Sequence, residues 1–278
     1  MTLTIKRVAT IEECRQIEIL QHQIWGGDVI DVVPDHILIT FVKNQGMALL
    51  ALENDHPVGF CYSFLGQTSE GMLKHCSHQA GVLPNIQASG VGYALKVAQR
   101  EAVLERGLNI ISWTFDPMMG LNANLNIGKL GAISHTYYEN LYGDMRTEIN
   151  VGLDSDRLEV QWRLNSPNVL NKLNNAEVLN ENENISTINM ATRNRDGNHV
   201  PPNKWQPFTE NKHYILLPDN IQTIKETDLP LTQAWQVQIR TLFQAAFAQG
   251  YIIADFIWHR DQGLGYYLLT KETPYYEN

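Results

Sequence analysis

Residues 82–107 read VLPNIQASGVGYALKVAQREAVLERG. In this stretch a proline and two glycines, Gly90 and Gly92, separate an apolar run from a run with helical spacing. The spacing predicts a strand, a glycine-containing loop and a helix that ends at Gly107. The first turn of a helix offers unpaired backbone N–H groups and the positive end of the helix dipole. The loop therefore predicts a site for a phosphate group.

The segments on either side of this stretch predict a mixed α/β sheet. Residues 4–8 alternate as a strand, and Thr10 with Glu13 forms a capping box before apolar residues at helical spacing. A short second helix is expected next, followed by three strands within residues 47–83. After the glycine loop and its helix, residues 109–115 form an apolar run that predicts a buried strand. Helices and strands therefore alternate after an antiparallel opening, as in a mixed sheet.

A change in composition divides the chain. Residues 165–204 are rich in Asn, Glu, Ser and Thr, with too few clustered apolar residues for a core. We expect them to form a surface insertion between a first domain, residues 1–164, and a smaller α/β extension, residues 205–278. Within the extension, residues 231–247 have the apolar spacing of an amphipathic helix, and residues 251–271 are expected to contain a hairpin.

The overall composition narrows the choice of partners. A formal net charge of -9 argues against nucleic acid, because neutralising phosphates needs a surplus of Lys and Arg. The three cysteines cannot all pair, and we interpret them as buried thiols of a cytoplasmic protein without membrane segments. The histidines and cysteines show no metal-ligand spacing, so no metal is expected. A homodimer is compatible with the sequence, which does not indicate an oligomeric state.

Three kinds of phosphate loop compete for the glycine stretch. The P-loop is excluded because no Lys-Ser or Lys-Thr follows either glycine. A dinucleotide fingerprint fits poorly because Leu95 stands at its third glycine position and residues 84–89 separate the strand from Gly90. The third kind fits: Gln87-Ala88-Ser89-Gly90-Val91-Gly92 resembles the acyl-CoA signature [QR]-x-x-G-x-[GA] of the GNAT superfamily of N-acetyltransferases. An ordinary strand-to-helix turn is the structural alternative.

Further motifs agree with this resemblance. The segment NIGKLGA, residues 126–132, is similar in part to a later landmark of the superfamily. The segments SWTFDP, TYYENLYG and DSDRLEVQW resemble a subfamily of predicted GNAT enzymes with a C-terminal extension. The resemblance covers most of the chain except the Asn-rich segment. It implies a GNAT-type twisted mixed sheet flanked by helices and, for some relatives, N-acyl transfer to amino acids, including N-succinyl transfer.

The resemblance also implies a binding mode for the co-substrate, acetyl-CoA or another acyl-CoA. The backbone amides of the loop would bind the CoA diphosphate. A backbone N–H at a splay near the end of the fourth strand would stabilise the thioester oxygen, and pantetheine would bind the same strand edge. One asparagine of the later helix would contact pantetheine. These roles map to Val82 and Leu83 on the strand, to Gln87, Ala88, Ser89, Gly90, Val91 and Gly92 in the loop, and to Asn122, Asn124 or Asn126.

The residues that move protons are less well defined. His78 and Asp116 are candidates for the general base; the alternatives are a histidine packed beside the sheet and an Asp-Pro turn. The superfamily's tyrosine acid falls on Ile127 and is not carried over. Tyr138 or a neighbouring tyrosine could replace it, although strand aromatics are more often core residues.

A substrate carboxylate would be bound by an arginine. Arg157 is the first candidate because guanidinium binds carboxylate with two hydrogen bonds, and Arg146 is a second one. The alternative is a surface ion pair with Asp154, Asp156 or Glu148, which is the favoured interpretation for Arg146. The sequence thus predicts an acyl-CoA:amine N-acyltransferase acting on a small metabolite such as an amino acid. A CoA-binding regulatory module without turnover and a dinucleotide-dependent enzyme remain the alternatives.

Overall fold

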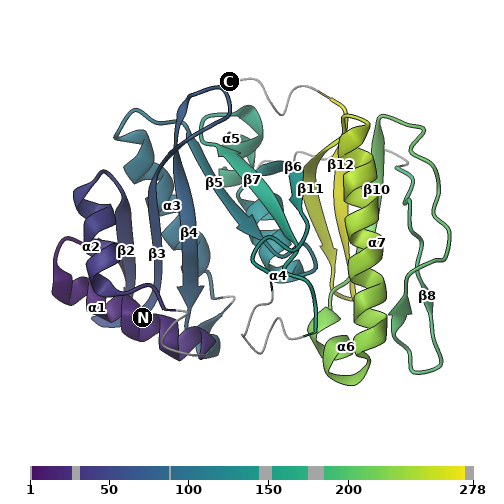
Figure 1. Cartoon of the computed structure of the whole chain (residues 1–278), viewed down its shortest axis with the longest axis horizontal. Coiled ribbons are helices and arrows are strands. Elements are labelled where there is room, and N and C mark those ends of the chain that lie inside the picture. Colours follow the sequence, from purple (N-terminus) through teal and green to yellow (C-terminus); the bar gives the residue numbers. More distant parts are fainter. Residues whose placement is uncertain (1, 27–31, 88, 144–151, 175–184, 273–278) are drawn as a thin grey trace. The chain divides into compact units, whose positions relative to one another are not determined.

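A computed structural model covers the chain, residues 1–278 (Figure 1). It describes all residues except 1, 27–31, 88, 144–151, 175–184 and 273–278. By their internal contacts the described residues form two compact units, a first one ending at Trp113 and a second one beginning at Thr114. The two units are described in turn.

The first unit contains a sheet of antiparallel strands to which one parallel strand is added. The strand order is β1-β2-β3-β4-β5. Neighbours are antiparallel up to β4, whereas β5 runs parallel to β4. The last two residues of β5 belong to the second unit. The strands are β1 (Leu3–Arg7), β2 (Met47–Glu53), β3 (His56–Gln67), β4 (Leu73–Val82) and β5 (Ile110–Phe115).

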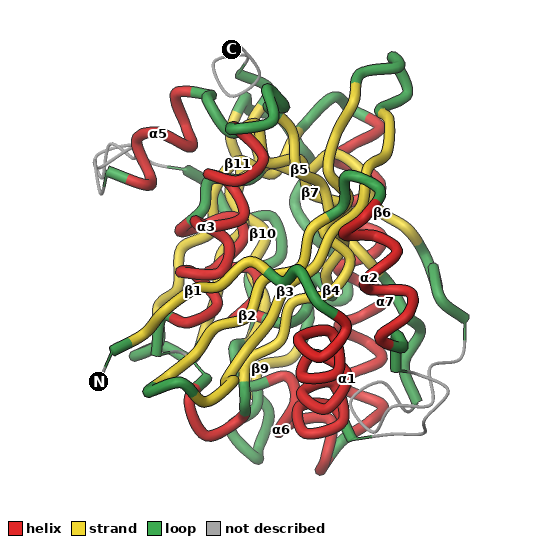
Figure 2. The backbone as a smooth tube through the Cα atoms, turned by 90° about the vertical axis from the view of Figure 1, so that its left-hand side faces the viewer, coloured by secondary structure: helices red, strands yellow, loops and turns green. Residues whose placement is uncertain are grey.

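Helices cover both faces of this sheet (Figure 2). They are α1 (Ile11–Trp25) and α2 (Asp35–Lys43) on one face and α3 (Val91–Leu104) on the other. Thr10 and Glu13 form the expected capping box at the start of α1. Leu20 and Leu38 pack with Phe60 on the α1–α2 face, and Leu95 packs with Cys61 on the α3 face. The predicted mixed α/β fold class is confirmed by this topology.

The second unit has a wholly antiparallel sheet with the order β7-β6-β11-β12-β10. Its strands are β6 (Ile133–Tyr138), β7 (Arg157–Arg163), β10 (Lys212–Pro218), β11 (Ile252–His259) and β12 (Leu264–Thr270), with a separate pair β8 (Thr192–Arg193) and β9 (His199–Val200). Its helices are α4 (Gly120–Ala123), a π-helix η3 (Asn124–Lys129), α5 (Pro167–Leu173), α6 (Ile221–Thr227) and α7 (Leu229–Ala248).

The C-terminal elements agree with the sequence pattern. The amphipathic stretch forms α7, whose first turn is capped by the Asp228 carboxylate accepting the Leu231 N–H. Trp235 and Phe243 of this helix are fully buried. The expected hairpin is β11 and β12. Among the described residues, no helix combines the length and the apolarity that crossing a membrane requires.

The Asn-rich segment is more deeply packed than its composition suggests. Val169 on α5 and Ile188 are buried in the second unit. The buried amide of Asn189 accepts the Leu216 N–H and donates to the Leu216 carbonyl, with distances of 2.9 Å each, as a neighbouring strand would. The described parts of residues 165–204 are thus anchored rather than lying loosely on the surface. The domain limits at residues 164 and 204 stay a prediction.

Candidate functional site

The glycine loop joins the end of β4 to the start of α3, as the sequence predicts. After Val82 the chain makes a short 3₁₀ turn, η2 (Pro84–Ile86), and reaches α3 through Gly90. Gly90 is the N-cap of α3 and has φ +96°, a left-handed conformation that favours glycine. Apart from Gly90, its two chain neighbours and the helix backbone, no atom of the described residues lies within 4 Å of the place where a Cβ would stand. Glycine is therefore required here by the backbone conformation and not by crowding.

The first turn of α3 presents backbone donors. The first intrahelical hydrogen bond runs from the Ala94 N–H to the Gly90 carbonyl, at 2.9 Å. The N–H groups of Val91 and Gly92 precede it and have no partner within the helix. No side chain caps this end among the described residues. Together with the positive end of the helix dipole, these groups form a site suited to a phosphate. Ala88 lies outside the described residues.

The signature glutamine lies beside these donors but faces the strand. Its side-chain Nε2 donates to the Val82 carbonyl, with a distance of 3.3 Å. Leu83 continues β4 by donating its N–H to the Val58 carbonyl at 3.0 Å. Gln87 thus ties the loop to the end of β4 and fixes where α3 begins.

Strands β4 and β5 separate where the candidate site begins. They are in register only at His75–Ile111 and Cys76–Ser112, although β4 continues to Val82. On its other side β4 pairs with β3 along its whole length. In the described part of the first unit, residues 77–82 therefore have an edge that is not paired with β5. An extended ligand can add hydrogen bonds at such an edge.

A β-bulge in β4 lies directly beyond the last pair. Tyr62 of β3 is opposite Gln79 and Ser63 is opposite Ser77, so His78 is the extra residue. A bulge leaves one residue out of the ladder and re-aims its backbone and side chain. We expected a backbone donor at Val82 or its neighbour, and this stays a prediction. The sequence contains no signal for the bulge, because its position depends on the register of two strands.

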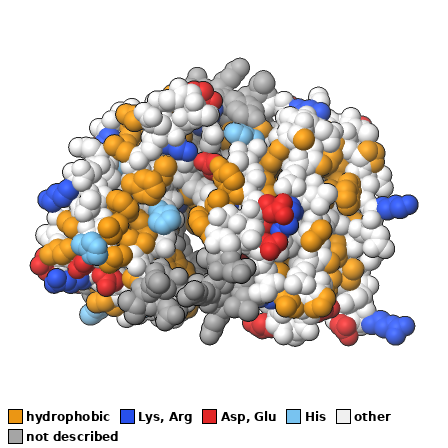
Figure 3. All heavy atoms as spheres, in the orientation of Figure 1, with side chains coloured by type: hydrophobic (Ala, Val, Ile, Leu, Met, Phe, Trp, Pro, Cys, Tyr) orange, Lys and Arg blue, Asp and Glu red, His pale blue; other side chains and the backbone are white. Residues whose placement is uncertain are grey.

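The His78 side chain is exposed and lies among aromatic rings. It meets the ring of Tyr62 edge-on with centroids 5.7 Å apart, and the ring of Phe64 lies 6.2 Å away. These neighbours partly exclude water and lower the pKa of His78 below its ordinary value. At neutral pH the His78 imidazole, with its lowered pKa, is uncharged and able to accept a proton. Figure 3 shows apolar side chains gathered on the visible face of the first unit.

Asp116, the other candidate base, belongs to the second unit. Its Oδ1 accepts the Met118 N–H at 2.9 Å, which is the geometry of a turn begun by the aspartate side chain. Burial raises the pKa of this carboxyl, while Met118 and the positive charge of Arg157 act in the opposite direction. Asp116 thus has a structural role in the turn and also a perturbed pKa of the kind found in functional sites.

The hydroxyls of the three candidate tyrosines, Tyr137, Tyr138 and Tyr142, are engaged with carboxylates or a hydroxyl. Tyr138 donates to Glu159 Oε2 at 2.7 Å, and this bond raises the pKa of Tyr138 to about 12. Tyr137 donates to Asp156 Oδ2 at 2.6 Å, and the Tyr142 hydroxyl lies 3.0 Å from that of Thr114. Because a carboxylate partner disfavours the phenolate, Tyr138 is a weak proton donor in this arrangement.

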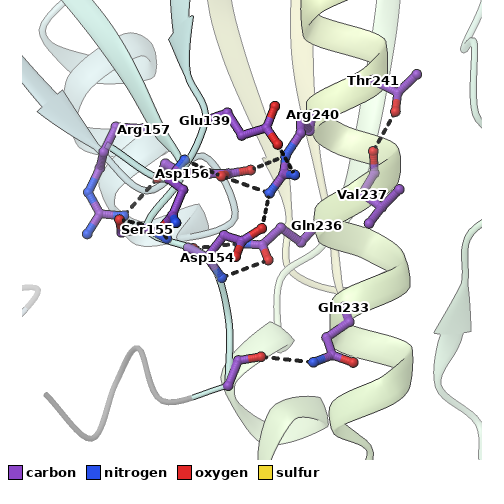
Figure 4. Close-up of polar contacts among 12 residues, drawn as sticks. Glu139, Asp154, Ser155, Asp156, Arg157, Gln233, Gln236, Val237, Arg240 and Thr241 are labelled. Atoms are coloured by element: carbon purple, nitrogen blue, oxygen red, sulfur yellow. Dashed lines mark hydrogen bonds and ion pairs between the residues drawn. The ribbon is translucent and has the colours of Figure 1, made fainter. Parts of the chain in front are cut away.

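The acidic residues near Arg157 pair with a different arginine. Arg240 of α7 binds Glu139 at 2.7 Å, Asp154 at 2.5 Å and Asp156 at 2.8 Å (Figure 4). Gln236, one turn earlier on the helix, exchanges two hydrogen bonds with the Asp154 backbone. The ion pair between Asp156 and Arg240 was not predicted from the sequence, because the two residues are 84 positions apart in the chain.

Arg157 itself is 9% exposed. Its Nη1 donates to the Asp156 carbonyl at 2.7 Å, and its guanidinium lies 5.4 Å from the centre of the Tyr142 ring. Asp154 and Asp156, the alternative partners considered for Arg157, form ion pairs with Arg240. Arg146 lies outside the described residues.

The three asparagines proposed for pantetheine lie in two consecutive short helices of the second unit. Asn122 is in α4 and is half-buried, whereas Asn124 and Asn126 are in the π-helix. Asn126 is 5% exposed. Short π-helices often occur at functional sites, but the structure does not select one asparagine.

The candidate residues therefore fall into two groups. The first unit holds one set along β4 and at the start of α3, namely His78 in the strand, Val82 and Leu83 at its end, and Gln87, Ser89, Gly90, Val91 and Gly92 in the loop and the first helical turn. The second unit holds the other set, namely Asp116, Asn122, Asn126, Tyr138 and Arg157.

Comparison with known proteins gives similar structures but no similar sequence. No family model matches the chain, and no curated protein matches it either. The similar structures include the NatC complex bound to Gag peptide and CoA, with 12% identity and a TM-score of 0.48 over 59% of this chain and 99% of that one. They also include a GNAT-family acetyltransferase from Streptococcus pneumoniae, with 14% identity and a TM-score of 0.48 over 58% and 98%.

A ribosomal-protein-alanine N-acetyltransferase from Escherichia coli is similar as well, with 14% identity and a TM-score of 0.45 over 66% of this chain and 99% of that one. These similar structures are acetyltransferases, the class that the sequence resembles. At such scores the likeness carries no argument about activity. The features that bear on function are the separation of β4 from β5 after Cys76, the bulge at His78 and the N–H groups in the first turn of α3.

Proposed function

We propose that this protein is an acyl-CoA:amine N-acyltransferase. The observation that supports this most is the separation of β4 from β5 after Cys76, directly before a bulge and a glycine-capped helix start. One strand thus offers an unpaired edge for an amide-rich arm and, at its end, backbone donors for a diphosphate. Coenzyme A has these two parts in this order.

The diphosphate of CoA would bind the amides of the loop from Gln87 to Gly92. The positive end of the α3 dipole favours that negative charge. The pantetheine arm would pair with the β4 edge near Val82 and Leu83, and Asn122 or Asn126 would add a side-chain contact. These contacts orient the thioester before reaction and lower the entropy cost of the bimolecular step.

Acyl transfer would then proceed by attack of a neutral amine on the thioester carbon. A backbone N–H in β4, at Val82 or at the bulge, would stabilise the carbonyl oxygen as it gains negative charge. His78 would accept the amine proton, directly or through water, with Asp116 as the second candidate. The C–S bond breaks and its electron pair stays on sulfur. A thiolate is a tolerable leaving group, so Tyr138 is not essential as an acid.

The transferred group would be acetyl, succinyl or another short acyl group. The acceptor would be the amine of a small metabolite such as an amino acid, with Arg157 as the candidate for its carboxylate. This choice follows the resemblance of the sequence, and the solved structures that are similar include enzymes named for other acceptors. A cytoplasmic location and a homodimer stay predictions.

Two measurements separate this proposal from its alternatives. Calorimetric titration should show binding of acetyl-CoA in preference to NAD; the reverse preference would favour a dinucleotide-dependent enzyme. Acetyl-CoA and succinyl-CoA are then incubated with a panel of amino acids and other small amines while free thiol is measured. Thiol release that needs both protein and amine supports the enzyme. Tight CoA binding without thiol release across the panel would favour a regulatory module.

A further inference from the structure

A lysine lies in the core of the first unit without an acidic partner. Lys96 of α3 is 4% exposed. Its ammonium donates to Ser77 Oγ at 2.8 Å and to Gln99 Oε1 at 3.2 Å, and it lies 3.7 Å from the centre of the Trp113 ring. Among the described residues no carboxylate pairs with it. Lysine is almost never fully buried unless it is paired, so this position calls for a reason.

Lys96 lies at the place where β4 and β5 separate. Cys76 and Ser112 are the last residues that pair between β4 and β5. Ser77 and Trp113, which hold the ammonium, are the residues that follow them on the two strands. Lys96 therefore contacts both strands at the first step beyond their last pair. It approaches from the α3 face, which is opposite the α1–α2 face where Tyr62 and His78 meet.

The neighbours of Lys96 do not compensate its charge. Cys61 of β3 is a buried thiol whose pKa is raised to about 12, so it is neutral. His75, two residues before Ser77 on β4, has a pKa lowered to about 4, mainly by burial, and is neutral as well. Burial lowers the pKa of Lys96 itself to about 8, and the Cys61 thiol acts weakly in the opposite direction. Around neutral pH the ammonium is mostly charged and lacks a negative partner.

The side-chain N–H group of Gln99, next to Lys96, has no hydrogen-bond acceptor in the described part of the chain. Gln99 is fully buried, and its Oε1 accepts from Lys96 while its Nε2 has no partner in the described part of the chain. The cluster therefore has more donors than acceptors. Buried donors are normally satisfied, so an excess points to a partner that is an acceptor or an anion.

We propose that Lys96 is a buried cation that stabilises negative charge formed in the split between β4 and β5. This inference rests on the proposed function, which places the thioester of acyl-CoA along that strand edge. In the reaction the amine nitrogen forms the C–N bond, the C–S bond breaks, and the electron pair passes through the carbonyl oxygen to sulfur. The amine proton goes to the base. Lys96 keeps its proton throughout and acts by charge alone.

The test uses Lys96→Met, which keeps the length of the side chain and removes the charge. The apparent pKa of the thiol of bound CoA is measured from the ultraviolet absorbance of the thiolate as pH is varied. In the unchanged protein this pKa should lie below that in Lys96→Met by about one unit, a tenfold change in ionisation constant. Lys43→Met, on the exposed end of α2, is the matched control and should equal the unchanged protein.

Stability provides the second readout. Removing an unpaired buried charge ends its desolvation cost, and this gain offsets the loss of the hydrogen bonds to Ser77 and Gln99. Lys96→Met should therefore unfold at no lower denaturant concentration than the unchanged protein. Its acyl transfer should nevertheless be slower. The unchanged protein should lose activity above about pH 8 as Lys96 loses its proton, and Lys96→Met should not show this decline. A destabilised Lys96→Met with an unchanged CoA thiol pKa would show that the lysine is structural and overturn the inference. Failure of the unchanged protein to bind CoA would instead overturn the proposed function itself, and this inference with it.

Discussion

The imidazole of His78 meets the ring of Tyr62 edge-on at 5.7 Å, and the Tyr62 hydroxyl is buried without a hydrogen-bond partner in the described part of the chain. The same lack of a partner applies to Oε1 of Gln79, which is opposite Tyr62 in the β3–β4 register. The bulge thus places a titratable side chain beside two unsatisfied polar atoms. Natural cores rarely retain such atoms unless something else uses them.

Replacing Tyr62 by phenylalanine removes one of these atoms. A buried hydroxyl without a partner loses its hydrogen bonds to water and gains none in the protein. Tyr62→Phe should therefore raise the free energy of unfolding by about 1 kcal/mol. Urea denaturation followed by fluorescence measures this. A loss of stability of similar size would mean that the hydroxyl is satisfied in solution.

His78→Gln tests the proposed base. Proton transfer by a positioned side chain contributes at least about 100-fold, so kcat at neutral pH should fall by that factor. In the unchanged protein activity should fall as pH drops through the pKa of His78, which lies below its ordinary value because the neighbouring rings partly exclude water. His78→Gln should lack this acid limb. An unaltered profile in the variant would transfer the role to Asp116.

Gly90→Ala tests the loop. At φ +96° a side chain is strained, and we expect a loss of roughly 1–2 kcal/mol in unfolding free energy. Relief of that strain would move the donors of the first turn of α3, so the Kd for CoA should also rise. Gly107→Ala is the matched control, because Gly107 follows the same helix at φ +73° with no atom near its absent Cβ. Gly107→Ala should lose a similar amount of stability and bind CoA as the unchanged protein does. Equal weakening of CoA binding in both variants would contradict a role of the Gly90 loop in CoA binding.

Arg240→Met tests the acidic cluster of the second unit. Asp156, with a side chain 2% exposed, would remain buried without its arginine, at a cost of about 3 kcal/mol in unfolding free energy. Arg260→Met, which removes an exposed guanidinium over the Trp258 ring, should cost under about 1 kcal/mol. Similar losses in the two variants would contradict the role given to Arg240.

Local signals in the sequence were sufficient for the parts of the fold that depend on neighbouring residues. The capping box of Thr10 and Glu13, the glycine at the start of α3 and the amphipathic pattern of α7 each act within a few residues. A pattern of this kind has the same physical meaning whatever the rest of the chain does, so it could be interpreted directly.

Features that depend on distant segments could not be predicted in this way. The bulge at His78 is a property of the register between β3 and β4. Lys96 lies in a helix where a lysine usually faces solvent, and only the packing of α3 on two strands shows that it is buried. Arg240 pairs with carboxylates more than 80 residues earlier in the chain.

A crystal structure of the protein with bound CoA tests the central claim most directly. The account predicts the diphosphate on the N–H groups that open α3, next to Gly90, and the pantetheine arm against β4 beyond Cys76. Coenzyme bound elsewhere, or side chains filling the turn before α3 so that no diphosphate can reach its amides, would contradict it.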